Sequence, residues 1–123
     1  MVAIRGANSV EANTKEAILE ATEIMLKAVI EQNNLKDEDM MSIFFSATKD
    51  LDAVYPAVAA RKLGITNASL LCLQEMSVEG SLKMCVRLLM HVDSDLLQKD
   101  VQHVYLGESV NLRPDLMMKE LQE

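Results

Sequence analysis

The chain has 123 residues, which is one domain by the usual span of roughly 100–200 residues, so we expect a single domain over residues 1–123. Its composition, half hydrophobic and one quarter charged, is that of a globular protein, and its formal net charge of -7 disfavours nucleic acids and anionic membrane surfaces as partners. No apolar run approaches ~18 residues, and residues 1–6 are too short an apolar patch for a secretory signal, so we expect a soluble, cytoplasmic protein.

The first third of the chain predicts a strand followed by a helix. Apolar side chains alternate with others over residues 2–7, which is typical of a strand. Apolar side chains then recur at spacings of three and four from residue 17 to 29, which indicates an amphipathic helix. Asn13 or Thr14 can cap its start, and residues 32–34 end it.

The rest of the chain predicts more strands and one short helix. We expect strands over residues 40–47, 68–74, 84–92 and 101–106, and a helix over about 55–63. This order predicts an α/β (α+β) fold, a mixed β-sheet with helices packed on one face. The other face of such a sheet is left uncovered and apolar in a chain this short, which predicts an oligomer.

The two cysteines, Cys72 and Cys85, both lie inside apolar runs. That position is typical of small buried hydrophobic residues. A disulfide framework or a metal site would need more ligands at tighter spacing, so we expect neither.

The arginines carry the strongest functional signal. The four arginines of the chain are Arg5, Arg61, Arg87 and Arg113. Arg87 lies within the apolar stretch 84–90, where an unpaired guanidinium would be costly, so an anion must face it. Because side chains alternate along a strand, Arg87 shares one strand face with Cys85, Leu89 and His91. If Arg5 lies on the same face of the sheet, the two guanidinium groups point into one pocket. The anion is either a small dianionic ligand or a protein carboxylate such as Glu75 or Asp115, and both interpretations stay open.

Conventional catalytic groups are scarce. The sequence has no glycine-rich phosphate loop and no serine in a nucleophile elbow. His91 and His103 lack metal-ligand spacing and are typical of core or edge residues. Glu75 follows an apolar strand and is either a structural counter-ion or a polar group inside a site. Arginines with one carboxylate and no nucleophile suit chemistry that needs only positioning and charge stabilisation.

Several stretches of the chain form a pattern in a fixed order and spacing: Ile4-Arg5-Gly6-Ala7, residues 50–57, 72–76 and 85–88, and residues 103–106 continuing through 112–116. Together they resemble the monofunctional chorismate mutases of the AroH class. The resemblance implies a homotrimer that forms a pseudo-α/β barrel with sites at the subunit interfaces. It also implies the Claisen rearrangement of chorismate to prephenate, on the way to phenylalanine and tyrosine, without a cofactor or a covalent intermediate.

The resemblance assigns roles to individual residues. It implies that Arg87 lies against the ether oxygen, that Arg5 and Tyr105 hold a substrate carboxylate, and that Glu75 and Cys72 address the ring hydroxyl. Further substrate-binding residues that it implies are Tyr55, Ala57 and Leu112 in the apolar wall and Arg61 and Arg113 at the mouth. Because Cys72 and Glu75 are three residues apart, a regular strand would point them to opposite faces.

The sequence departs from the family pattern at a few positions. Val58 stands where the family often has lysine, Leu71 where it usually has threonine, and Tyr55 where it usually has phenylalanine. Lys49 replaces a proline. These changes put substrate affinity in doubt more than reaction type. The tail 117–123 is unmatched and is expected to be mobile until substrate binds.

Two other functions compete with catalysis of this rearrangement. One is a non-catalytic trimeric module that binds a small anion and regulates another protein. The other is an enamine or imine deaminase, since such enzymes share a similar trimeric α/β fold. Turnover, binding without turnover and inertness toward chorismate distinguish the three.

Overall fold

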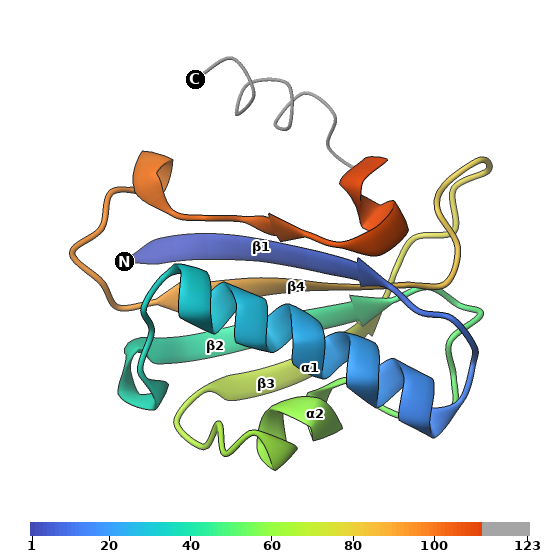
Figure 1. Ribbon diagram of the computed structural model, residues 1–123, viewed down its shortest axis with the longest axis horizontal. Coiled ribbons are helices and arrows are strands. Elements are labelled where there is room, and N and C mark those ends of the chain that lie inside the picture. Colours follow the sequence, from blue (N-terminus) through green and yellow to red (C-terminus); the bar gives the residue numbers. More distant parts are fainter. Residues whose placement is uncertain (112–123) are drawn as a thin grey trace.

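Strands and helices alternate along the first half of the chain, and three further strands follow (Figure 1). The computed structural model describes residues 1–111, so Leu112, Arg113 and the tail 117–123 lie outside the described residues. The strands are β1 (Val2–Ser9), β2 (Met40–Ala47), β3 (Ser69–Gln74), β4 (Cys85–Val92) and β5 (Val104–Tyr105), and the helices are α1 (Lys15–Gln32) and α2 (Ala57–Lys62). Short 3-10 turns cover Asp37–Asp39, Gln98–Asp100 and Gly107–Asn111.

The five strands form one mixed sheet in the order β3-β2-β4-β1-β5, which confirms the predicted fold class. β4 lies in the middle and runs antiparallel to both β1 and β2, whereas the β1–β5 and β2–β3 pairs are parallel. In this register Leu89 of β4 pairs with Arg5 of β1. Arg87 of β4 pairs with Ala7 of β1 on one side and with Ser46 of β2 on the other. The register therefore brings Arg5 and Arg87 onto the same face of the sheet.

Helix α1 begins where the cap residues predicted it. Thr14 is the N-cap, and its hydroxyl oxygen accepts a hydrogen bond from the Ala17 amide at 3.1 Å. Asn13 has a different role, because its side-chain oxygen accepts from the amides of Asp52 and Ala53 and so ties the helix start to the loop before α2.

Both helices pack on one face of the sheet (Figure 1). The apolar stripe of α1, which includes the fully buried Ile18, Met25 and Val29, lies over the sheet. Gly6 permits this close approach, because a Cβ added there would lie 3.2 Å from side-chain carbons of Met25, Val29 and Leu88. The helix-covered face is therefore the hydrophobic core. None of the described helices is long and apolar enough to cross a membrane.

The last strand is shorter than predicted because side chains satisfy backbone groups that a longer strand would have paired. Gln98 donates to the Ala3 carbonyl at 2.6 Å and accepts from the Ala3 amide at 2.8 Å. Asn33 accepts from the Gln102 amide at 2.8 Å and donates to its carbonyl at 3.0 Å. Strand pairing between β5 and β1 is therefore left to residues 104 and 105.

A side-chain clamp fixes the start of β4 against the end of β2. Met84 has a left-handed backbone, with φ of 52°, and its amide donates to both carboxylate oxygens of Asp50 at 3.1 and 3.2 Å. The Thr48 hydroxyl oxygen accepts from the Cys85 amide at 3.1 Å and donates to Asp50. These hydrogen bonds fix the start of β4, and therefore the position of Arg87 two residues later.

Candidate active site

A cavity of about 380 Å³ opens on the face of the sheet that the helices do not cover, and it is called the open-face cavity below. It is lined by Arg5, Phe44, Phe45, Ser46, Leu73, Glu75, Arg87, Leu88 and Leu89. β1, β2, β3 and β4 all reach it, and it unites three residues that the sequence nominated: Arg5, Glu75 and Arg87.

Arg87 and Glu75 form an ion pair in this cavity. The Arg87 Nη1 atom lies 2.9 Å from Glu75 Oε1, and both side chains keep about one third of their surface exposed (34% and 28%). Of the two interpretations of Arg87, the protein carboxylate is therefore present, and it is Glu75. A guanidinium has five N–H donors, so one bond to Glu75 leaves others for a ligand oxygen.

Arg5 differs from Arg87 because no carboxylate among residues 1–111 pairs with it. Its Nε atom is buried and has no hydrogen-bond partner in that part of the chain. The backbone amide of Arg5 donates to Nδ1 of His103 at 3.0 Å, which holds β1 where the guanidinium enters the cavity. A cation with an unsatisfied buried donor fits an anionic ligand such as a carboxylate.

Tyr105 stands beside β1 on the same face. It pairs with Ala7 in the parallel β1–β5 ladder, and paired residues share a face, so Tyr105 lies on the side of Arg5. Its hydroxyl is buried and has no partner among the described residues, as with Arg5 Nε. Tyr105 does not line the open-face cavity, however.

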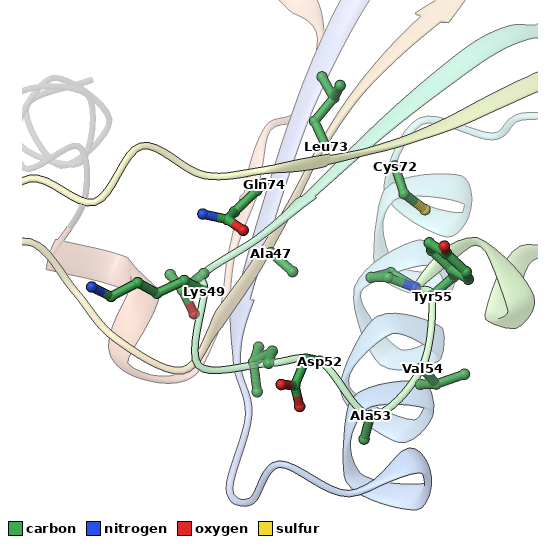
Figure 2. Close-up of a pocket in the computed structure, with 12 residues that line it drawn as sticks. Ala47, Lys49, Asp52, Ala53, Val54, Tyr55, Cys72, Leu73 and Gln74 are labelled. Atoms are coloured by element: carbon green, nitrogen blue, oxygen red, sulfur yellow. The ribbon is translucent and has the colours of Figure 1, made fainter.

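A second cavity of about 460 Å³ lies at the β3 edge, between β3 and the loop that precedes α2 (Figure 2). Tyr55 and Cys72 line this edge cavity rather than the open-face cavity. Figure 2 shows Cys72 and Leu73 pointing to opposite sides of β3. Cys72 packs against the core and Glu75 lines the open-face cavity, so the two residues lie on opposite sides of the sheet, as strand parity predicts. Leu73 is the residue that the linings of the two cavities share.

Two other nominated residues lie away from both cavities. Ala57, the first residue of α2, is buried in the core, and Arg61 is exposed in the last turn of the same helix. The structure of this chain therefore brings together Arg5, Glu75 and Arg87, and it leaves Tyr55, Cys72 and Arg61 outside that group.

The cysteines and histidines have structural surroundings. Both cysteines are free thiols, and burial raises the pKa of the Cys85 thiol from 9.0 to about 11, although the Arg87 charge acts in the opposite direction. His91 shares a hydrogen bond with the Ser42 hydroxyl at 3.0 Å and packs edge-on against Phe44. Within residues 1–111, no group of three or more His, Cys, Asp and Glu residues is placed to hold a metal ion.

Ser46 is the polar lining residue that the sequence reasoning missed. Its hydroxyl donates to Glu75 Oε2 at 2.5 Å, and it lies opposite Arg87 in the β2–β4 pair. The apolar run of residues 40–47 predicts the strand, but only the strand order shows that Ser46 lies beside Arg87.

The chain is similar to known proteins over nearly its whole length. The chain matches the family model for chorismate mutase type I over residues 1–116. It is 47% identical over 116 residues to "Chorismate mutase AroH" of Bacillus subtilis (strain 168), covering 94% of this chain and 91% of that protein. It is 43% identical over 114 residues to "Chorismate mutase AroH" of Thermus thermophilus, covering 92% and 93%.

A solved structure is equally similar. The chorismate mutase from Clostridium thermocellum superposes with a TM-score of 0.85 at 48% identity, covering 87% of this chain and 96% of that one. The fold, the convergence of Arg5, Glu75 and Arg87, and matches over nearly the whole chain lead to one assignment. The chain belongs to the chorismate mutase type I family.

Proposed function

We propose that this protein rearranges chorismate to prephenate, in the biosynthesis of phenylalanine and tyrosine, and that the substrate lies in the open-face cavity. One observation carries the location: two guanidinium groups and one carboxylate meet in that cavity, and one of the guanidinium groups has no carboxylate partner among residues 1–111. Chorismate is a dicarboxylate, and its rearrangement is unimolecular and requires no nucleophile. Family membership does not favour a deaminase or a regulatory anion-binding module.

Arg87 has the central role in the proposed mechanism. The C–O bond of the substrate breaks ahead of C–C bond formation, so negative charge builds on the ether oxygen. A guanidinium fixed beside that oxygen stabilises the developing charge more than it stabilises the ground state. Glu75 holds Arg87 through Nη1 and leaves its remaining donors for the ether oxygen.

The other polar groups bind the substrate and orient it. Arg5 pairs with a substrate carboxylate, and in this proposal the carboxylate extends from the open-face cavity toward β5, where the buried Tyr105 hydroxyl donates to it. The free lone pairs of Glu75 accept from the ring hydroxyl. Holding the compact pseudo-diaxial conformer in this way lowers the entropic part of the barrier.

We also propose a homotrimer in which neighbouring copies cover the open face and complete each site. Leu71 and Leu73 on that side are about half exposed, and Tyr55 at the β3 edge is 73% exposed, so a neighbouring copy would cover apolar side chains there. Tyr55 and Arg61 lie outside the open-face cavity of their own subunit, so in this proposal they serve the site of a neighbour. Cys72 and Ala57 also lie outside the open-face cavity of their own subunit, so in this proposal their substrate-binding roles likewise require a neighbouring copy. The roles of Leu112 and Arg113 are proposed as the family resemblance implies them. Two free thiols fit the proposed cytoplasmic location.

An absorbance assay tests the proposal. The purified protein is incubated with chorismate, the loss of ultraviolet absorbance is followed, and prephenate is identified as the product. We expect turnover in the wild type and a rise in KM of about 10- to 100-fold in Arg5→Ala, the scale of a lost hydrogen bond to a charged group. Lys27→Ala, which removes an exposed cation from α1, is the matched control and keeps the wild-type KM.

Each contrary result has a distinct meaning. Binding of chorismate without turnover supports a regulatory module, and inertness contradicts a mutase. A wild-type KM in Arg5→Ala contradicts the location of the site but not the activity. Gel filtration at the volume of a monomer contradicts the trimer.

A further inference from the structure

Ser46 contacts the charged pair of the open-face cavity from the centre of the sheet. It lies on β2 directly opposite Arg87 of β4 and opposite Leu73 of β3, so its side chain has Arg87 on one side and the end of β3, where Glu75 lies, on the other. Its hydroxyl donates to Glu75 Oε2 at 2.5 Å, while Arg87 donates to Oε1 at 2.9 Å. Each carboxylate oxygen therefore has its own donor, and the two donors belong to different strands.

The backbone holds Glu75 as well. Glu75 follows the last residue of β3, and its amide donates to the Ala47 carbonyl at 2.9 Å. β2 thus fixes both the main chain of Glu75, through Ala47, and its carboxylate, through Ser46. Without the serine hydroxyl, the carboxylate could rotate about its side-chain bonds, because it is partly exposed and has only Arg87 to hold it.

The position of Glu75 in turn decides where Arg87 points. The ion pair uses Nη1, and the guanidinium is a rigid planar fork, so fixing one nitrogen restricts the direction of the others. Hydrogen bonds that include a charged group are also stronger and more directional than neutral ones. The chain of contacts therefore runs from Ser46 through Glu75 to the donors that Arg87 leaves free.

We propose that Ser46 is a positioning residue of the rearrangement: its hydroxyl fixes the Glu75 carboxylate, which aims the Arg87 guanidinium into the open-face cavity. This inference rests on the proposed function, since it assumes that Arg87 acts in that cavity. Ser46 acts through Glu75 and has no separate contact with the reacting atoms.

The first test compares substitutions at position 46. Ser46→Ala removes the donor and is expected to lower kcat about 10-fold, with KM changed much less, because the aim of Arg87 matters most in the transition state. Ser46→Thr keeps a hydroxyl on a residue that favours strands and is expected to restore most of kcat. Wild-type kcat in Ser46→Ala, or an equal loss in Ser46→Thr, overturns the proposal.

Ser42→Ala is the matched control. Ser42 lies on the same strand and face, but its hydroxyl bonds to His91 and it does not line the open-face cavity. We expect the wild-type kcat in this variant. Thermal melting of all three proteins shows whether any loss of kcat comes from unfolding, and a fall of kcat in Ser42→Ala equal to that in Ser46→Ala overturns the proposal.

A double-mutant cycle with Glu75→Ala separates this inference from the proposed site. If Ser46 acts through Glu75, Ser46→Ala produces no further loss in the Glu75→Ala background. A further 10-fold loss there shows that Ser46 acts independently of Glu75 and contradicts the inference alone. If Glu75→Ala and Arg87→Ala both keep wild-type turnover, the proposed site fails, whatever Ser46→Ala does.

Discussion

The two faces of β4 have opposite compositions. Val86 and Met90 are fully buried under the helices, whereas Arg87 and His91 lie on the face that the helices leave uncovered. Successive residues of a strand point to opposite sides, so one strand supplies the centre of the core and the candidate catalytic cation. Neighbouring residues of β4 therefore serve the hydrophobic core and the candidate site in turn. Substitutions on the helix-covered face should lower the free energy of unfolding, and substitutions on the other face should lower kcat.

The largest effect is expected on the helix-covered face. Met90→Ala removes a fully buried side chain from the middle of the sheet and should lower the free energy of unfolding by about 2–5 kcal/mol through lost burial and the cavity left behind. Urea denaturation measures this loss. The kcat of the remaining folded protein should stay near the wild-type value, and a fall of 100-fold would show that the two faces are not separable.

Arg87→Lys changes the open face and is expected to lower kcat while leaving the stability of the fold nearly unchanged. The charge is kept, but one ammonium cannot reproduce the planar fork that bonds Glu75 and, in the proposed mechanism, the substrate, so kcat should fall on the order of 10² to 10³. The unfolding midpoint in urea should move little, because the ion pair is partly exposed. Near wild-type turnover in steady-state assays would refute the role of Arg87.

The smallest expected effect is a pH dependence of stability that comes from the buried Cys85 thiol. Burial raises its thiol pKa from 9.0 to about 11, so in this interval the folded protein binds the proton that the unfolded chain has lost. Stability is therefore complete below pH 9 and decreases as the pH rises toward 11, by at most about 1.4 kcal/mol per pH unit for one proton.

Urea denaturation between pH 8 and 11 measures this dependence. Cys85→Ala should lose less stability over the interval than the wild type, and Cys72→Ala, which removes the other free thiol, should follow the wild type. Parallel curves for the wild type and Cys85→Ala would show that the Cys85 thiol does not lose its proton on unfolding in this range.

Most of the elements could be predicted because they depend on local periodicity. The strand over residues 40–47 has the predicted bounds, and α1 begins after one of its two predicted caps. Parity also placed Cys72 and Glu75 correctly on opposite sides of β3. The cost of an unpaired guanidinium in an apolar run predicted that an anion faces Arg87 but left a ligand and a protein carboxylate both open, and the structure shows Glu75 beside it.

What could not be predicted depends on contacts between distant segments. Nothing local indicates that β4 lies between β1 and β2, so the proximity of Ser46 to Arg87 was not foreseen. The length of β5 depends on Gln98 and Asn33, whose side chains replace strand pairing from other parts of the chain. Tyr55 and Arg61 were nominated by family resemblance, and the fold of the single chain does not bring them to the open-face cavity.

The central place of β4 also constrains how the chain folds. β4 is the last long strand in the sequence, yet it separates β1 from β2 (Figure 1). During synthesis β1 must wait, with no long neighbour, until residues 85–92 leave the ribosome, and such unpaired edges are prone to aggregation. Pairing over this sequence distance also slows folding. A nascent chain that ends before Cys85 therefore lacks the strand that joins β1 to β2, and it also lacks Arg87. The same segment completes the core and supplies the candidate catalytic cation.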